Sequence, residues 1–327
     1  MVPESTAAPA RAGGDSAAAP AETAAADGRT VIESDGLTKH FGDVVAVDDV
    51  SLSVRSGEAF GFLGHNGAGK STTINMLLGF TRPTAGSATV LGHDTVAESA
   101  RLRERIGVLP ERFAVYDRLT GYEHLQHAID IKGADDDPER LIERVGLTPD
   151  EADRKAGGYS TGMEQRLALG TALVGDPELL ILDEPNSGLD PGGKQEIRDI
   201  IREAVDRGTT VFLSSHDLTE VEAVCDRVGI MSQGEMVRVD SLEGLRDEAG
   251  GGTRIELTVD AMPDTDLESL DGVTGVQRDG DTILADCESP ARKVDVVTSV
   301  AADTAVLDIV SEEQSLEELF TSLTGER

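Results

Sequence analysis

Residues 64–71 read Gly64-His65-Asn66-Gly67-Ala68-Gly69-Lys70-Ser71 and fit the phosphate-loop pattern G-x-x-x-x-G-K-[ST]. Glycines let the backbone turn tightly, and successive N–H groups of such a turn form a nest for an anion. An apolar run at residues 59–63 precedes the loop, and a predicted helix at 71–78 follows it. This order disfavours the alternative, a glycine-rich turn that binds nothing. It predicts an α/β fold in which the positive end of the helix faces phosphates.

A second apolar run ends in two carboxylates. Residues 179–185 read LLILDEP, and a buried strand of this kind delivers Asp183 and Glu184 to one edge of a sheet. With the phosphate loop nearby, Asp183 and the Ser71 hydroxyl are predicted to hold Mg²⁺, and Glu184 to face the attacking water. Lys70 is predicted to reach the β- and γ-phosphates of ATP. The alternative, a strand that ends in solvated acids, is disfavoured by the combination of the two motifs.

The chain is strongly acidic. Its 327 residues include 62 Asp and Glu against 29 Lys and Arg, which gives a net charge of −33. Such a surface repels nucleic acid, so a DNA- or RNA-binding role is disfavoured. An acidic excess along the whole length resembles the proteins of salt-adapted archaea and predicts a halophilic protein.

Cysteine usage and hydropathy restrict the compartment. Cys225 and Cys287 lie far apart and form no C-x-x-C pair, so the sequence predicts neither a disulfide framework nor a zinc site. This cysteine usage is typical of proteins in a reducing cytoplasm. No run approaches the ~20 apolar residues that span a bilayer, and the N-terminus lacks the pattern of a secretory signal. If the protein serves a membrane process, a partner must supply the membrane-spanning part.

Composition divides the chain into segments. Residues 1–28 are rich in Ala and Pro and are predicted to be a disordered tail. Residues 30–248 carry the motifs, and Gly250-Gly251-Gly252 is predicted to be a linker to a small domain at 253–327. Alternation in that domain predicts a ferredoxin-like β-α-β-β-α-β order. Its predicted elements are strands at 254–259, 273–277, 282–285 and 305–310 and helices at 264–270, 289–302 and 315–323.

The middle of the chain is predicted to be helical from 112 to 158, with a break at 135–138, and again from 163 to 174. His124 and His127 stand three apart on one such helix and could form half of a metal site. Without further ligands, we expect solvated histidines on a helix face.

The segment 30–248 resembles an ABC (ATP-binding cassette) ATPase. It has, in the order of that family, the phosphate loop, a signature YSTGM at 159–163, the LLILDEP strand, a loop at 187–191 and a histidine, His216, after a further strand. The resemblance implies an α/β P-loop NTPase domain: a RecA-like core with an antiparallel β subdomain and a helical subdomain. It also implies ATP and Mg²⁺ as cofactors and hydrolysis of ATP to ADP and phosphate.

The same resemblance assigns further residues. Phe41 stacks on adenine, for which the alternative is a half-buried core Phe. Ser160 and Gly162 contact phosphate held by another subunit, and His216 orients the γ-phosphate, for which the alternative is a structural His. Glu184, His216 and Lys70 are the predicted catalytic residues, and Ser71, Glu111 and Asp183 the predicted metal ligands. The predicted nucleotide-binding residues are Phe41, Gly64, His65, Asn66, Gly67, Ala68, Gly69, Lys70, Ser71, Thr72, Glu111, Ser160, Gly162, Asp183 and Asp190.

Two departures from the family pattern narrow the branch. The signature reads YSTGM where LSGGQ is usual, and Glu111 in Leu109-Pro110-Glu111 replaces a Gln. Both forms are similar to those of ABC-2-type transporters. Glu111 could still bind Mg²⁺ or water, although its charge lies beside that of ATP.

The resemblance implies the ATPase subunit of an ABC-2-type transporter, bound peripherally at the cytoplasmic face of the membrane. Its partners are a membrane-spanning permease, met by residues 112–125, and a second ATPase subunit in a homodimer or heterodimer. The motifs are similar to those of drug, sodium and haem-related exporters, and of the ATPase that serves copper-site maturation of nitrous-oxide reductase. The alternatives are a soluble ABC ATPase that acts on ribosomes or DNA, and a module that binds nucleotide without hydrolysing it.

Overall fold

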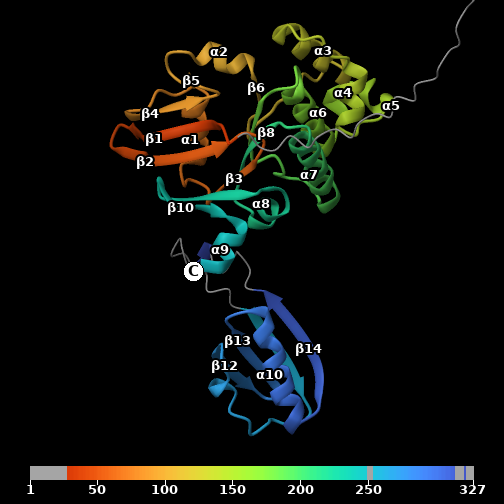
Figure 1. The fold of residues 1–327 in the computed structure, drawn as a ribbon. Coiled ribbons are helices and arrows are strands. Elements are labelled where there is room, and N and C mark those ends of the chain that lie inside the picture. Colours follow the sequence, from red (N-terminus) through yellow and green to blue (C-terminus); the bar gives the residue numbers. More distant parts are fainter. Residues whose placement is uncertain (1–27, 249–252, 314–319, 322–327) are drawn as a thin grey trace, which may run out of the picture.

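The computed structural model describes residues 28–248, 253–313 and 320–321 (Figure 1). The predicted tail, apart from Gly28, and the predicted glycine linker lie outside these residues. So does the predicted last helix at 315–323, apart from Phe320 and Thr321. The described residues form three sheets, and the phosphate loop follows a strand of the largest.

The central sheet has five parallel strands and one antiparallel edge strand. Every residue of β3, β7 and β8 is buried. Continuous apolar runs suit such strands, because a parallel sheet is covered on both faces. In spatial order the strands are β10 (Glu235–Ser241), β9 (Arg227–Ser232), β3 (Ala59–Gly64), β8 (Thr210–Ser215), β7 (Leu179–Asp183) and β6 (Ile106–Leu109).

Helices lie between or after the strands of this sheet in the order of the chain. They are α1 (Lys70–Leu77), α2 (Ser99–Glu104), α7 (Pro191–Asp206), α8 (Leu218–Val224) and α9 (Leu242–Glu248). Helix α1 begins at Lys70, within the phosphate-loop motif and one residue before the predicted start, and helix α7 begins at an Asp190 cap followed by Pro191. A cap followed by proline is a strong helix start, because the cap accepts a free N–H and proline has none to satisfy.

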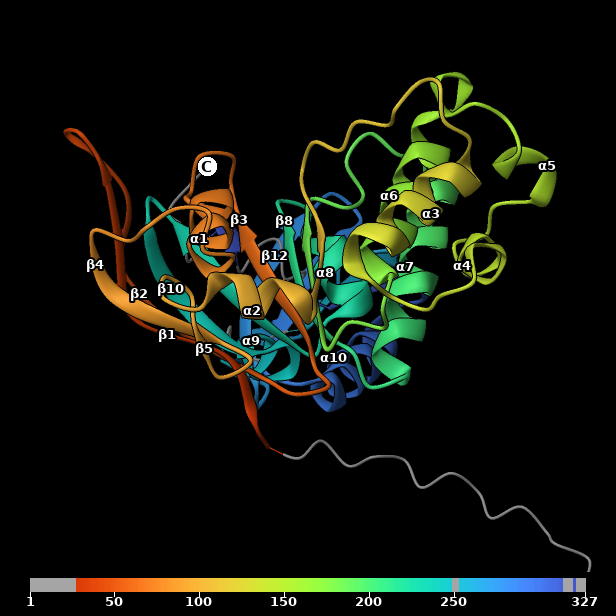
Figure 2. The ribbon, with the colours of Figure 1, turned by 90° about the horizontal axis from the view of Figure 1, so that it is seen from above.

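A second, antiparallel sheet lies on one side of the central strands, and the helical part lies on the other (Figure 2). Its strands, in spatial order, are β2 (Val44–Arg55), β1 (Thr30–Phe41), β4 (Ala85–Val90) and β5 (His93–Asp94). The β1–β2 turn uses Gly42 at φ 61°, a left-handed conformation that favours glycine. The buried side of this sheet shares one hydrophobic cluster with Phe60 and Phe62 of β3. This packing holds β2 next to the phosphate loop.

The helical part contains α3 (Gly121–Lys132), α4 (Pro138–Arg144), α5 (Pro149–Ala152), the 3₁₀ helix η1 (Ala156–Gly158) and α6 (Thr161–Leu173). The prediction of a helix from residue 112 is wrong for its first nine residues. A capping box between Thr120 and Glu123 starts α3 at Gly121, and this reciprocal pair fixes a helix N-terminus.

His124 explains the shape of the segment before α3. Its Nε2 accepts a hydrogen bond from the Tyr116 backbone N–H at 2.8 Å, and its Nδ1 lies 2.8 Å from the Thr120 carbonyl oxygen. His124 is 5% exposed, so the expectation of a solvated histidine is wrong there. Both ring nitrogens serve the backbone, which leaves neither for a metal ion. No cluster of three or more potential ligands occurs among the residues that the structure describes.

The third sheet follows residue 252 and has the order β12-β13-β11-β14, with every pairing antiparallel. The predicted β-α-β-β-α-β order holds except that the first helix is only a 3₁₀ turn of three residues, with Leu267 buried. The elements are β11 (Thr253–Val259), η2 (Leu267–Ser269), β12 (Val273–Asp279), β13 (Thr282–Cys287), α10 (Pro290–Asp303) and β14 (Val306–Glu313).

Candidate nucleotide-binding site

The phosphate loop has a conformation that requires its glycines. Gly67 and Gly69 have φ angles of 88° and 109°, which L-residues with a side chain rarely adopt. A Cβ on Gly69 would lie 2.5 Å from the Ala46 carbonyl oxygen, and one on Gly64 would lie 2.5 Å from that of Met231. The loop therefore fits between β2 and β9 only if both positions carry no side chain.

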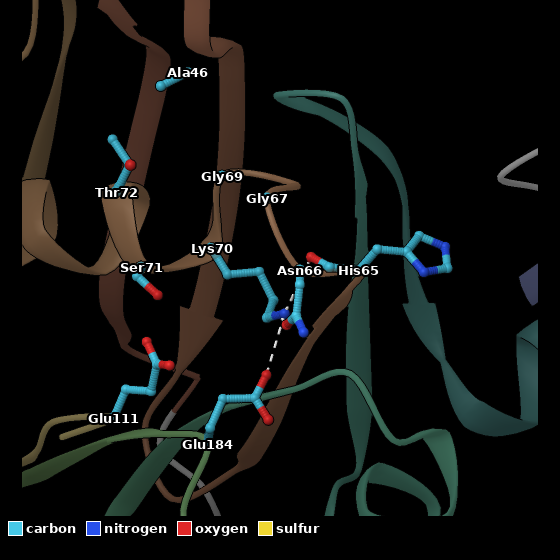
Figure 3. Close-up of a pocket in the computed structure, with 10 residues that line it drawn as sticks. All are labelled: Ala46, His65, Asn66, Gly67, Gly69, Lys70, Ser71, Thr72, Glu111 and Glu184. Atoms are coloured by element: carbon cyan, nitrogen blue, oxygen red, sulfur yellow. Dashed lines mark hydrogen bonds and ion pairs between the residues drawn. The ribbon is translucent and has the colours of Figure 1, made fainter. Parts of the chain in front are cut away.

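Lys70 lies at the start of α1 with its ammonium group turned back over the loop. Its Nζ donates a hydrogen bond to the Gly64 carbonyl oxygen at 2.6 Å and lies 3.4 Å from that of His65. The same Nζ is 3.2 Å from Glu184 Oε1 (Figure 3), and Lys70 is only 6% exposed. A cation this well shielded from water interacts strongly with a neighbouring anion. The loop and the LLILDEP strand thus meet at a Lys70–Glu184 ion pair.

Glu184 follows directly after β7 in a left-handed conformation, with φ 53°. Its backbone N–H is held by the carbonyl and hydroxyl oxygens of Ser214 on the neighbouring strand β8. His216 follows β8, and its Nδ1 lies 2.7 Å from Glu184 Oε2. An acid in a strained conformation with two oriented partners is typical of a functional position. The parallel pairing of β7 with β8 brings Glu184 and His216 together.

Asp183 is buried behind this group and accepts a hydrogen bond from the Ser214 hydroxyl. Sequence reasoning missed Ser214. The signal was present, because Ser214 and Ser215 are polar residues at the end of an apolar strand, but the pairing that gives them a partner is not local.

A cavity of about 280 Å³ opens over the loop (Figure 3). Nine predicted site residues line it: His65, Asn66, Gly67, Gly69, Lys70, Ser71, Thr72, Glu111 and Glu184. Glu111 follows β6 and reaches the cavity from the opposite side to the loop. Gly64 and Ala68 form the base of the loop without lining the cavity. Ala46 of β2 also lines it, and sequence reasoning missed this residue, because a small apolar side chain on a strand carries no motif.

The residues present fit a hydrated Mg²⁺ ion. Mg²⁺ is held by oxygen ligands, commonly one or two carboxylates together with substrate phosphates and water. Ser71 and Glu111 offer oxygen atoms at the cavity, and the Asp183 carboxylate adjoins Glu184 at the end of β7. These protein oxygen atoms are too few to fill the octahedral shell of Mg²⁺, so phosphate and water would supply the remaining ligands.

Besides Gly64 and Ala68, five predicted nucleotide-binding residues do not line the cavity: Phe41, Ser160, Gly162, Asp183 and Asp190. The predicted catalytic residue His216 does not line it either. Ser160 caps α6 by accepting from the Met163 N–H at 3.3 Å, and Asp190 caps α7 by accepting from the Gly193 N–H at 2.8 Å. Ser160 and Asp190 are exposed.

Phe41 closes β1 and is 52% exposed, with Lys39 Nζ 5.0 Å from its ring centroid. Phe41 belongs to none of the three hydrophobic clusters of the described residues, which argues against a core Phe, and its contact with adenine stays a prediction. Lys39 lies over one face of this exposed ring. The opposite face can stack on a planar base.

None of the helices that the structure describes is both long and apolar enough to cross a membrane.

Comparison with known proteins agrees with this geometry. A model of the ABC transporter family matches residues 47–187. The linearmycin resistance ATP-binding protein LnrL of Bacillus subtilis is 36% identical over 310 residues, which cover 90% of this chain and 98% of LnrL. The daunorubicin/doxorubicin resistance ATP-binding protein DrrA of Streptomyces peucetius is 35% identical, over 90% of this chain and 92% of DrrA.

Among solved structures, the dimeric structure of MJ0796, a bacterial ABC transporter cassette, superposes with a TM-score of 0.59 at 25% identity. The match covers 64% of this chain and 98% of that one. The predicted α/β ABC-type fold is confirmed. The chain therefore belongs to the ABC transporter family, as an ATP-binding protein that uses ATP with Mg²⁺ and whose activity is ATP hydrolysis.

Proposed function

We propose that this chain is the ATP-hydrolysing subunit of an ABC-2-type exporter of drug-like compounds. The observation that carries the proposal is the Lys70–Glu184–His216 arrangement at the mouth of the phosphate loop. The direction of transport and the class of substrate rest on the names of LnrL and DrrA, which are resistance proteins.

The site residues divide the chemistry. Lys70 neutralises charge on the transferred phosphoryl group, and the loop N–H groups hold the phosphates. Glu184 accepts a hydrogen bond from the attacking water and draws charge toward it, while His216 fixes the carboxylate from the far side. Ser71 and Asp183 would hold Mg²⁺, with Glu111 as a further oxygen donor, and the ion would supply positive charge that offsets the charge of the phosphates.

The site needs a second subunit. Ser160 and Gly162 lie at the N-terminus of α6, outside the cavity, and Ser160 is exposed. A helix N-terminus attracts an anion, so this one is free to meet the γ-phosphate held by another subunit. The dimer of MJ0796 supports this arrangement. We also propose that Phe41, which is exposed at the end of β1, stacks on adenine.

The permease is proposed to dock in a groove at the start of α3. The groove has a volume of about 520 Å³ and is lined by Tyr116, Leu119, Glu123, Gln126, His127 and Asp130. The segment that leads into it begins at Glu111, which lines the nucleotide cavity. The nine residues 112–120 join Glu111 to the start of α3, so a movement of Glu111 can be transmitted to the groove along the chain.

The groove gives a test of the proposal. Tyr116 is 62% exposed, and aromatic side chains of this kind are often interface hot spots worth 2 kcal/mol or more. Tyr116→Ala is expected to weaken co-purification with the permease by about 30-fold and to leave ATP binding unchanged. Phe80→Ala is the matched control, because Phe80 is a similarly exposed aromatic outside the groove. Equal recovery of the permease with Tyr116→Ala and wild type would refute docking at this groove.

Salt dependence is a second expectation, and it follows from the net charge of −33. Self-repulsion opposes the compact state at low ionic strength, and at ~1 M salt the Debye length falls to roughly 3 Å. The melting temperature and the ATPase rate are expected to rise steeply between dilute buffer and molar KCl. A melting temperature that is the same in both would contradict a halophilic protein. LnrL and DrrA come from bacteria, so an archaeal source remains a prediction from composition.

We do not extend the proposal to copper-site maturation, because LnrL and DrrA are both named for drug resistance. The acidic surface gives no support to a role on ribosomes or DNA.

A further inference from the structure

His65 of the phosphate loop lines the nucleotide cavity, but its ring is turned away from the other side chains that meet there. In Figure 3 the imidazole of His65 points away from Lys70 and Glu184. Its ring centroid lies 4.9 Å from that of Phe320, with an angle of 46° between the planes. Aromatic pairs at this separation are attractive beyond the area that they bury. The loop is therefore in contact with a residue 255 positions later in the chain.

Phe320 is well buried in this position. It is 8% exposed and belongs to the same hydrophobic cluster as Leu63, Leu182 and Leu213 of the central sheet. The chain leaves the ATP-binding part after α9, forms the third sheet, and places Phe320 back against the ATP-binding part. Phe320, seven residues after the end of β14, thus contacts the phosphate loop.

The backbone of His65 takes part in the loop itself. Its carbonyl oxygen accepts a hydrogen bond from the Ala68 N–H at 3.1 Å and lies 3.4 Å from Lys70 Nζ. A movement of the His65 backbone therefore moves the groups that shape the anion nest and that orient Lys70, and the packing of its ring against Phe320 restrains that movement. Donors fixed in place before binding stabilise an anion more than donors that must be ordered on binding.

We propose that Phe320 is a positioning residue for the phosphate loop: by supporting His65 from outside the cavity, it raises the affinity for ATP. The proposal rests on the proposed role of the loop in binding phosphate. It follows that anything that unseats Phe320, including a partner bound to the third sheet, weakens ATP binding.

The test is ATP affinity in the full-length chain, measured with a fluorescent ATP analogue and Mg²⁺ in molar KCl. Loss of an aromatic contact worth about 0.5–1.5 kcal/mol corresponds to a change of about 2- to 10-fold. Phe320→Ala is expected to raise Kd and KM by this factor while kcat changes less than KM. Phe320→Tyr keeps the ring and is expected to restore wild-type affinity.

Two controls separate positioning from general destabilisation. Val300→Ala removes a fully buried side chain of α10, and it is expected to lower the melting temperature without raising Kd. In a His65→Ala background, Phe320→Ala is expected to have little further effect, because the contact is already lost. If Phe320→Ala does not fold, Phe320→Leu takes its place, with a rise in Kd of about 2-fold expected.

The outcomes are distinct. A Kd unchanged by Phe320→Ala, or by Phe320→Leu where that variant takes its place, would overturn the proposal. The proposal would also be overturned if the rise in Kd of the double variant equalled the product of the rises caused by His65→Ala and Phe320→Ala alone. In either case a wild-type chain that binds ATP, together with a Lys70→Ala variant that does not, would leave the proposed function intact. A wild-type chain that does not bind ATP would overturn both.

Discussion

Replacing Glu184 by glutamine is expected to lower the ATP turnover number by about 10²- to 10⁴-fold, the usual cost of losing a general base. Glutamine keeps the shape of the side chain and removes its charge, so the attacking water loses the anion that polarises it. ATP binding should survive, because the loop glycines and Lys70 are unchanged. The substitution also removes the carboxylate that lies 3.2 Å from Lys70 Nζ. The Lys70 ammonium group then interacts more strongly with the phosphates of ATP. The measurement is kcat for the purified complex, with ATP binding followed in parallel.

Glu178→Gln is the matched control for this experiment. Glu178 precedes the same strand at its other end, is paired with Arg105 at 2.6 Å, and does not line the nucleotide cavity. Glu178→Gln is the same chemical change six positions before Glu184. The kcat of this variant is expected to stay near the wild-type value. Equal kcat for Glu184→Gln and wild type would remove Glu184 from the chemistry.

Mixing two inactive variants is expected to restore ATP hydrolysis in part, and this is the second large effect. Lys70→Ala and Ser160→Arg each damage both sites of their own homodimer, if Lys70 of one subunit shares a site with Ser160 of the other. In a mixed dimer both lesions fall on one site, and the other site is intact. Ser160 is exposed, so an arginine is accommodated there for about 1 kcal/mol of lost helix capping.

The control for mixing is Lys70→Ala with Glu184→Gln. Lys70 and Glu184 meet within one subunit, so every site of that mixed dimer carries one lesion, and no recovery is expected. ATPase rates are measured after mixing in equal amounts. Recovery in the control pair, or none in the test pair, would contradict a site shared between subunits.

The local parts of this site could be predicted from sequence because each motif is contiguous. The phosphate loop and the strand followed by Asp183 and Glu184 are identified from residues adjacent in the chain, whereas His216 is assigned by the resemblance to ABC ATPases. The structure adds that β7 and β8 are neighbours, which places His216 on Glu184. The roles assigned to the individual site residues all stay predictions, and those of Phe41, Ser160, Gly162 and Asp190 have no support from the cavity, which none of these four lines.

The residues that sequence reasoning missed all depend on contacts between distant segments. Ser214 matters because its strand pairs with β7, and Ala46 because the β1–β2 hairpin packs against the loop. His124 was expected to be solvated, yet its ring holds the Tyr116 N–H in the preceding turn. Phe320 reaches His65 across 255 positions. Periodicity describes one element at a time, so it carries no signal for such contacts.

The most direct test of the two-subunit site is the mass of the Glu184→Gln chain, measured by light scattering in molar KCl. ATP placed between the phosphate loop of one chain and Ser160 of the other adds contacts at two equivalent sites of a symmetric interface. High salt screens the repulsion between two acidic chains. With saturating ATP and Mg²⁺ the account predicts twice the 34.4 kDa of one chain, and without nucleotide a single chain. A monomer at saturating ATP and Mg²⁺ would contradict it.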